Sequence, residues 1–240
     1  MKKENPSRDL LWFGVGLILG VFLTRRRTGA AGAVSPLAAW ERALAARYGA
    51  RRAAILGAKV QARYVELFAG RPRFSNSALR DHFEARILPG IALYRVLREE
   101  TPDAEEALAA LDSCFAAHIQ ASSRSRLTRR LLDHLPGGFK TLGFLNRAVL
   151  RSSFPEQGWQ IQWVEDSPAC IAYDITSCFY QDMLNAYGVP ELTAHFCAGD
   201  DLMYGGLETI SWERTETLGR GDARCNFVFR PRVQPQGRVL

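Results

Sequence analysis

The sequence predicts an α+β protein, in which an N-terminal membrane-anchor helix and a helical region precede an antiparallel sheet of β-β-α-α-β-β order. Three observations predict it. An apolar run lies near the N-terminus, apolar residues then recur at helical spacing to about residue 150, and beyond Pro155 apolar and polar residues alternate. The 240 residues are 47% hydrophobic and 23% charged. This composition supports a core and excludes a disordered chain or a multi-span membrane protein.

Charge divides the chain into a basic and an acidic part. Residues 1–151 carry 25 Lys and Arg against 13 Asp and Glu, a net charge of +12, and residues 152–240 carry 6 against 12, a net charge of −6. A basic half suits nucleic acid or an anionic membrane, but no recognition motif accompanies it, so we expect no nucleic-acid partner. The predicted segments are an anchor (1–28), a linker (29–34), a helical region (35–151), an α+β region (152–232) and a tail (233–240).

Residues 10–24 form an uncharged run of fifteen residues, followed at once by three arginines. As a helix the run spans about 22 Å, short of the ~30 Å hydrocarbon core of a bilayer, but the arginines could reach the interface. We favour a single-pass anchor over a cleaved signal peptide or a buried helix. The basic C-terminal flank then keeps the main domain in the cytoplasm. The run would contact membrane lipid, and Gly16 and Gly20 would let two anchors pack as a homodimer, although helix flexibility also explains these glycines.

The helical region contains several segments in order. An apolar stripe at 3.6-residue spacing marks a helix from about Leu37 to Tyr48, and a second stripe continues to Phe68. A third helix is predicted from about 77 to 98, with an interruption near Pro89 and Gly90. A fourth begins after Pro102, and two shorter helices are predicted at 124–135 and after Gly138.

The α+β region begins with a predicted hairpin. Residues 159–164 and 170–176 alternate in polarity around a turn at 165–168. Two helices follow, at 178–187 and from Pro190 to about residue 204, each ended by glycine. Strands at 207–218 and 224–230 complete the expected sheet.

Four of the five cysteines lie in the acidic half. An odd count in a chain expected to face the cytoplasm argues against disulfides, and the absence of a C-x-x-C pair argues against a structural zinc site. Cys114 and Cys170 are predicted to be small buried hydrophobes. Cys225 alternates with Phe227 and Phe229, which places it on the apolar side of its strand, either as core or as part of a site.

Two cysteines have settings that suit chemistry. Cys178 stands at the start of a predicted helix, where the helix dipole lowers a thiol pKa. Cys197 lies three and four residues before Asp200 and Asp201, so the three share a helical face. Thiols and carboxylates so arranged can supply a nucleophile or a base that activates water.

A series of spaced motifs from residue 178 to residue 227 resembles a known hydrolase family. The motifs are Cys178, Gly188-Val189-Pro190-Glu191-Leu192, Phe196-Cys197-Ala198-Gly199-Asp200, Arg214, Thr217-Leu218, Gly221 and Cys225-Asn226-Phe227. In this order, over about residues 155–230, they are similar to the L-2-amino-thiazoline-4-carboxylic acid hydrolase family. The family pattern ends in Cys-Asp-Phe, so Asn226 stands where an aspartate is usual.

The resemblance implies hydrolytic opening of a small sulfur heterocycle, giving N-carbamoyl-cysteine or an analogue. That reaction needs a base for water, an acid for the leaving sulfur and a cation for the substrate carboxylate. We expect Asp200 to be the base, with Cys197, Cys178 and Cys225 as nucleophile or acid candidates. The expected substrate-binding residues are Arg214, whose guanidinium suits a carboxylate, and Glu191, His195 and Asn226.

A non-catalytic function remains as the alternative. The late glycine-rich turn before Cys-x-Phe also resembles vinyl-reductase-like sensor domains, which bind small ligands, and a membrane anchor suits a hydrophobic ligand. The sequence contains no phosphate loop, dinucleotide fingerprint, G-x-S-x-G or H-E-x-x-H motif. We therefore expect a small-molecule substrate or ligand and neither a cofactor nor a metal.

Overall fold

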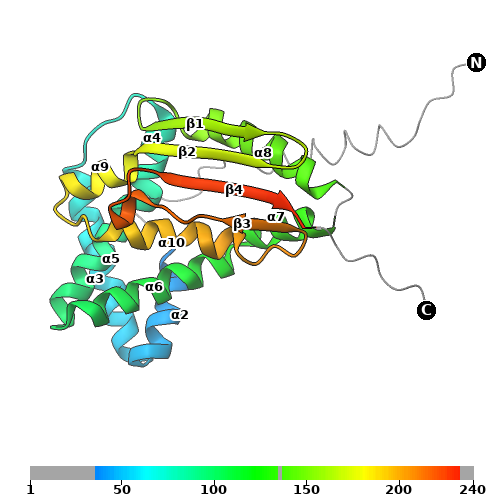
Figure 1. The fold of residues 1–240 in the computed structure, drawn as a ribbon. Helices are drawn as coiled ribbons and strands as arrows, with labels where there is room; N and C mark the ends of the chain where they lie inside the picture. Colours follow the sequence, from blue (N-terminus) through cyan, green and yellow to red (C-terminus); the bar gives the residue numbers. More distant parts are fainter. Residues whose placement is uncertain (1–35, 135–136, 233–240) are drawn as a thin grey trace, which may run out of the picture. The chain divides into compact units, whose positions relative to one another are not determined.

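The computed structural model describes residues 36–134 and 137–232. The predicted anchor and linker at 1–34 and the tail at 233–240 lie outside the described residues. Within the described ranges, no helix combines the length and the hydropathy that crossing a bilayer requires. These residues belong to one compact unit, which has the predicted α+β class with an antiparallel sheet (Figure 1).

The first helices form a small bundle. Helix α2 (Leu37–Tyr48) turns back at Gly49 (φ +84°) into α3 (Ala50–Ala69), and α5 (Leu88–Glu100) and α6 (Ala104–Ala121) pack against this pair. A left-handed φ costs glycine little, since it has no Cβ. Trp40, Leu44 and Leu56 are buried in the bundle, in agreement with the apolar stripes of the sequence.

A π-helical turn interrupts the third predicted helix. Helix α4 (Ser77–His82) is capped by the Asn76 side chain, which accepts from the Ala78 amide at 2.9 Å, and continues through η1 (Phe83–Ile87) directly into α5. The sequence placed the interruption near Pro89, a few residues later. Pro89 has no N–H to donate to the preceding turn, so the helix widens before the proline rather than at it.

The four strands form one sheet of order β1-β2-β4-β3 with antiparallel neighbours. Strand β1 (Trp159–Asp166) and strand β2 (Ile171–Cys178) form the predicted hairpin. Helices α9 (Phe179–Ala186) and α10 (Leu192–Tyr204) follow, and β3 (Ile210–Glu213) and β4 (Cys225–Pro231) end the described fold.

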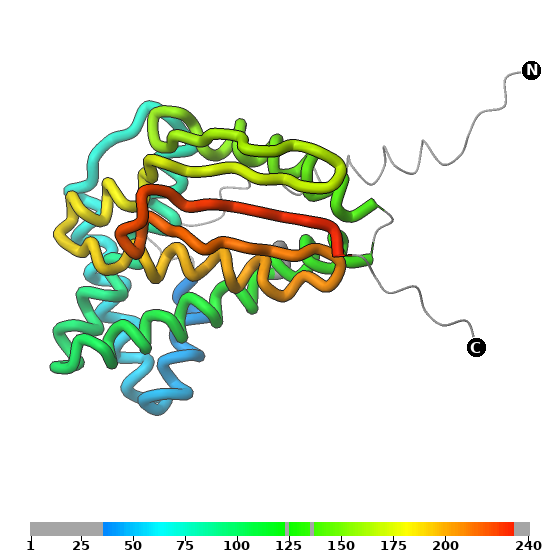
Figure 2. The backbone as a smooth tube through the Cα atoms, in the orientation of Figure 1, coloured from blue at the N-terminus to red at the C-terminus, as the bar shows by residue number. Residues whose placement is uncertain are grey.

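Helices cover one face of this sheet. Tyr173 is paired with Phe227, and Ile171 with Phe229, so these side chains share a face. Helix α8 (Gly138–Ser153) packs on this face beside Ile171, and the Tyr204 ring of α10 lies 5.1 Å from the Phe229 ring. The helices and the sheet therefore form two layers, and the strands lie in front of α8 in Figure 2.

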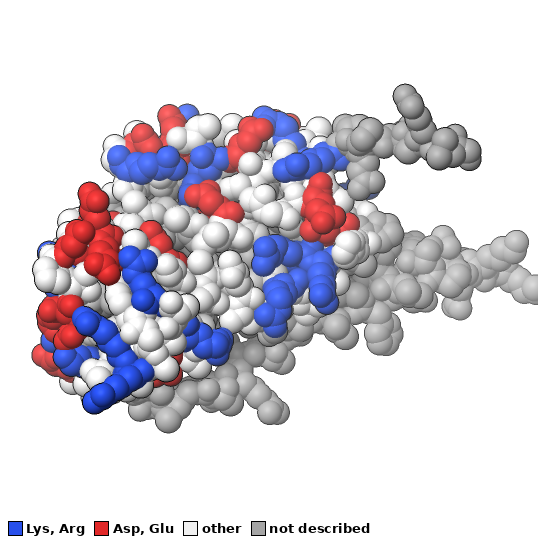
Figure 3. Space-filling model, turned by 90° about the horizontal axis from the view of Figure 1, so that it is seen from below, with Lys and Arg blue, Asp and Glu red and all other residues white. Residues whose placement is uncertain are grey.

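The other face of the sheet is polar. Arg224 binds Asp174 at 2.8 Å, and Arg230 binds Glu213 at 3.2 Å. An antiparallel sheet can leave one face to water in this way. Seen from below, basic and acidic side chains of the molecule are intermixed around a mostly uncharged area (Figure 3).

The predicted strand at 207–218 is wrong in length. Only Ile210–Glu213 pair with β4, and a 3-10 turn, η2 (Leu218–Arg220), replaces the end of the expected strand. The backbone amides before and after β3 donate to side chains instead of to a neighbouring strand. The Glu208 amide donates to Asp133 at 2.8 Å, and the Glu216 amide donates to Asn226 at 2.7 Å.

Substitution of Gly219 by alanine tests the packing of η2 on α10. A Cβ on Gly219 would lie 2.8 Å from the backbone N and Cα of Ala194, so the backbone would have to shift. We expect Gly219→Ala to lower the free energy of unfolding by about 1–3 kcal/mol, measured by urea denaturation.

The matched control is Gly70→Ala. Gly70 has φ −93° and no atom within 4 Å of the added Cβ, so we expect a change of less than about 0.5 kcal/mol. Equal denaturation midpoints for Gly219→Ala and the wild type would contradict the close contact.

Candidate functional site

Three thiols meet where the sheet joins the helices. Cys178 ends β2 and caps α9, Cys197 lies in α10, and Cys225 begins β4. Cys197 and Cys225 lie near enough to shift each other's pKa, Cys197 also raises the pKa of Cys178, and Cys178 raises that of Cys225. The structure therefore brings together three of the four residues expected to be catalytic.

The ionisation of Cys197 and Cys225 is coupled. The Cys197 hydrogen bond lowers the pKa of Cys225 to about 7, aided by Thr217 and the Leu218 amide, whose nitrogen lies 3.3 Å from the Cys225 sulfur. The same bond, together with burial, raises the pKa of Cys197. The two thiols thus titrate as a coupled pair, in which buried Cys225 is the more acidic thiol and the more accessible Cys197 the less acidic one.

The ionisation predicted for Cys178 is wrong. Burial raises the pKa of Cys178 to about 11, although the Gln181 and Tyr180 amides at the start of α9 oppose this shift. Desolvation of the thiolate outweighs the backbone donors of the helix start. Cys178 therefore remains a thiol at neutral pH, which suits a proton donor better than a nucleophile.

Asp200 lies one helical turn after Cys197. Burial raises the pKa of Asp200 to about 7 against the lowering effect of Arg214, and Cys197 and Asp201 raise it further. Its side chain is still 42% exposed, so the carboxyl is closely surrounded yet open to a ligand. A carboxyl group that titrates near neutral pH can take up and release protons.

Arg214 holds the acidic side of the site. Its side chain is 1% exposed and donates to Asp200 at 3.1 Å, to Asp201 at 2.7 Å and to the Cys197 carbonyl at 3.0 Å. The guanidinium also lies over the Trp212 and Phe227 rings. These contacts occupy both terminal nitrogens, so the geometry favours positioning of the carboxylates over the substrate binding that we expected.

Glu191 and His195 make their hydrogen bonds with the helical bundle. The Tyr94 hydroxyl donates to Glu191 at 2.6 Å, and His195 Nδ1 lies 2.6 Å from Asp112. These contacts tie α10 to α5 and α6. The hydrogen bonds of Glu191 and His195 are thus made to the bundle and not to the thiols.

Asn226 holds the segment that leads into η2. Its Oδ1 accepts from the amides of Thr215 (2.9 Å) and Glu216 (2.7 Å), and its Nδ2 donates to the Thr215 hydroxyl at 2.8 Å. An aspartate could accept the same two amide bonds. The residue at this position therefore shapes the loop that presents Thr217 and Leu218 to Cys225.

Tyr180 and Arg86 belong to the site but were not predicted from the sequence. Burial raises the pKa of Tyr180, Arg86 lowers it, and Cys178 and Asp200 raise it further. Tyr180 thus lies among groups from η1, α9 and α10. The predicted helix interruption at Pro89 and Gly90 was the only sequence signal near Arg86. The structure has a π-turn just before it, and π-turns often occur at functional sites.

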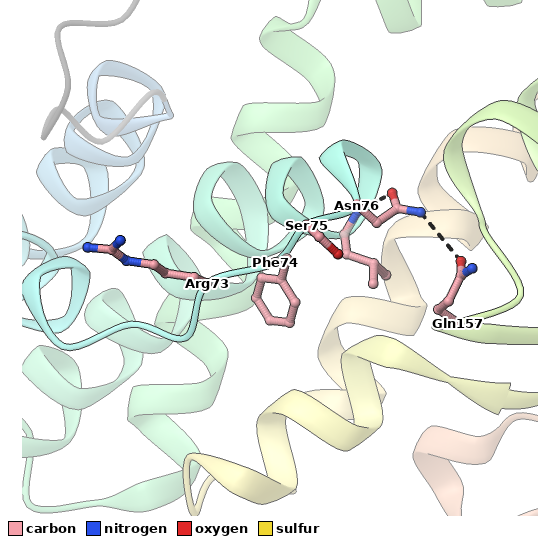
Figure 4. Close-up of a pocket in the computed structure, with 6 residues that line it drawn as sticks. Arg73, Phe74, Ser75, Asn76 and Gln157 are labelled. Carbon is pink, nitrogen blue, oxygen red and sulfur yellow. Dashed lines mark hydrogen bonds between the residues drawn. The ribbon is translucent and has the colours of Figure 1, made fainter.

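Two recesses lie elsewhere on the molecule. One, of about 460 Å³, is lined by Arg73, Asn76 and Gln157 near the start of α4 (Figure 4). The other, of about 370 Å³, lies between α8 and the β1–β2 turn. Neither contains a cysteine. Among the described residues no group of three or more His, Cys, Asp or Glu is arranged to hold a metal.

Comparison with known proteins gives one match. A family model described as L-2-amino-thiazoline-4-carboxylic acid hydrolase matches residues 80–229, which is more than half of the chain and includes every residue of the thiol site. Searches of curated proteins and of solved structures find no significant match.

Substitutions of Asn226 test its role in the loop. We expect Asn226→Ala to lower the free energy of unfolding by about 1–3 kcal/mol, because two backbone amides lose their acceptor. Asn226→Asp keeps an acceptor, so its urea midpoint should stay near the wild-type value. An Asn226→Ala protein as stable as the wild type would contradict this role.

Proposed function

The chain belongs to the L-2-amino-thiazoline-4-carboxylic acid hydrolase family, and we propose that it opens the ring of 2-aminothiazoline-4-carboxylate or a close analogue by hydrolysis. The observation that carries this proposal is the convergence of Asp200 with the Cys197–Cys225 pair in one partly exposed site. A residue that gains and loses protons near pH 7, beside thiols, suits both halves of the reaction.

Asp200 acts first as the base. Its carboxylate takes a proton from a water molecule as the water oxygen bonds to the amidine carbon, and the C=N electron pair moves to nitrogen, which is protonated. Arg214 keeps Asp200 in place through a charge-assisted hydrogen bond. Asp200 must be ionised to accept this proton.

The ring opens in the second step. The carbon–sulfur bond breaks and its electron pair leaves on sulfur. The oxygen bound to carbon becomes a carbonyl and gives its proton to solvent, which balances the proton that nitrogen took from solvent in the first step. The sulfur takes a proton from Asp200 or from Cys178, whose thiol is protonated at neutral pH. The product is a carbamoyl amine with a free thiol, so thiol release reports turnover.

The thiol pair supports a covalent route to the same product. Cys197 sulfur attacks the amidine carbon and the C=N electron pair moves to nitrogen, which takes a proton from solvent, while the Cys197 proton passes to the neighbouring Cys225. The C=N bond forms again as the ring carbon–sulfur bond breaks, nitrogen returns its proton to solvent, and the ring sulfur leaves with its electron pair and takes a proton from Cys178 or solvent. Water activated by Asp200 then adds to the same carbon, the bond to Cys197 breaks, the oxygen becomes a carbonyl, and Cys197 regains its proton from Cys225. Trapping of an adduct on Cys197 by mass spectrometry would distinguish this route from direct attack by water.

Asn226, which stands where the family pattern has an aspartate, does not prevent either proposed route of hydrolysis. Asn226 binds the backbone of Thr215 and Glu216, and neither proposed route uses it. We therefore infer an active hydrolase despite the missing aspartate.

Replacement of Asp200 gives a pH-dependent loss of activity. The pKa of Asp200 is raised to about 7, so the base is ionised above pH 7 and protonated below it. We expect Asp200→Asn to lower kcat/KM at pH 8 by about 100-fold or more. The difference from the wild type should shrink as the pH falls through 7. Thiol release across pH 5–9 measures this.

The matched control is Asp182→Asn, which removes an exposed carboxylate from α9. Its pH profile should follow that of the wild type. If Asp200→Asn and Cys197→Ser both kept full turnover, the assignment of the site would be wrong.

A further inference from the structure

The proposed reaction needs a cation for the substrate carboxylate, and both terminal nitrogens of Arg214 are already occupied, which leaves only its buried Nε without a partner. Arg214 is buried and already binds two carboxylates. To bind a third through the same nitrogens it would have to release Asp200 or Asp201. A different cation is therefore required if the carboxylate is bound by charge.

Arg86 meets this requirement. It lies on the π-turn η1 and is exposed, and η1 packs against α9, which carries Tyr180. Among the described residues, no carboxylate forms an ion pair with Arg86, whereas Arg71, Arg147 and Arg230 each pair with one carboxylate and Arg224 pairs with two.

A chain of hydrogen bonds fixes Tyr180 beside Arg86. The Ser153 carbonyl can only accept, so His82 Nε2, 2.9 Å away, carries the proton in the neutral ring. His82 Nδ1 is then an acceptor, and the Tyr180 hydroxyl donates to it at 2.9 Å. Arg86 follows His82 by four residues, and its charge lies near enough to lower the pKa of Tyr180. A guanidinium has five N–H donors, which are available to a ligand.

The surroundings of Arg86 suit a small anion. Burial, with a smaller effect from the nearby Arg86 charge, lowers the pKa of His118 of α6. His118 is therefore neutral at pH 7 and can donate a hydrogen bond without adding charge. The Tyr180 ring also lies 5.3 Å from the ring of Phe196, the residue before Cys197. The aromatic side chains of Tyr180 and Phe196 therefore connect the surroundings of Arg86 with those of Cys197.

We propose that Arg86, oriented by Tyr180 and His82, binds the carboxylate of the substrate at the edge of the thiol site. This inference rests on the proposed function. It makes Arg86 the residue that selects a carboxylated heterocycle over a neutral one. Tyr180 and His82 are positioning residues, since they act through Arg86.

The test compares two substrates that differ by the carboxylate. For Arg86→Gln, kcat/KM with 2-aminothiazoline-4-carboxylate should fall about 10- to 100-fold, as expected for loss of a charged hydrogen bond, mainly through KM. Turnover of neutral 2-aminothiazoline should not change. Arg80→Gln is the matched control, because it removes an exposed arginine from the neighbouring helix α4, and it should leave both substrates unaffected.

Tyr180→Phe tests the orientation of Arg86. It should raise KM for the carboxylated substrate less than Arg86→Gln does, and it should add little in the double variant. An equal fall for both substrates in Arg86→Gln, or no fall for either, would overturn the proposal.

A binding measurement separates this inference from the proposed function. If the wild type turned over neither substrate, calorimetry would compare their binding to wild type and Arg86→Gln. Carboxylate-dependent binding that is lost in Arg86→Gln would support the Arg86 site while the hydrolase proposal failed. Equal affinities of both proteins for 2-aminothiazoline-4-carboxylate, or no binding, would overturn it.

Discussion

The buried ion pairs of Arg214 are the constraint on which the site depends. One guanidinium joins the segment after β3 to two carboxylates and a carbonyl of α10, and it lies over two aromatic rings of the sheet. A buried arginine without these partners would be an uncompensated charge, which is strongly destabilising. Arg214 thereby holds α10, and with it Cys197 and Asp200, at a defined place over the sheet.

A second constraint comes from the turn between β3 and β4. Asn226 binds two amides of this turn, and Thr217 and the Leu218 amide contact the Cys225 sulfur. Close packing of Gly219 on α10 joins the turn to the same helix. The loop therefore contributes to the ionisation of the thiol pair, because Thr217 and the Leu218 amide lower the pKa of Cys225.

Arg214, which the sequence assigned to substrate binding, and Arg86 have different surroundings. Arg214 is matched by carboxylates inside the protein, whereas exposed Arg86 forms no ion pair with a carboxylate of residues 36–134 or 137–232. A cation that is already neutralised organises structure, and one that is not can attract a ligand. In our proposal, Arg214 positions the base and Arg86 recognises the substrate.

The sequence by itself determined the α+β class, the hairpin, α9 and α10, the apolar side of β4 and the family, because periodicity and spaced motifs are local properties of the chain. It also placed Cys197 and Asp200 on one helical face, since four residues make one turn. The tertiary structure alone decided the ionisation of Cys178, the proximity of Cys197 and Cys225 and the different surroundings of Arg214 and Arg86. Burial and contacts between distant segments control these properties, and neither follows from spacing along the chain.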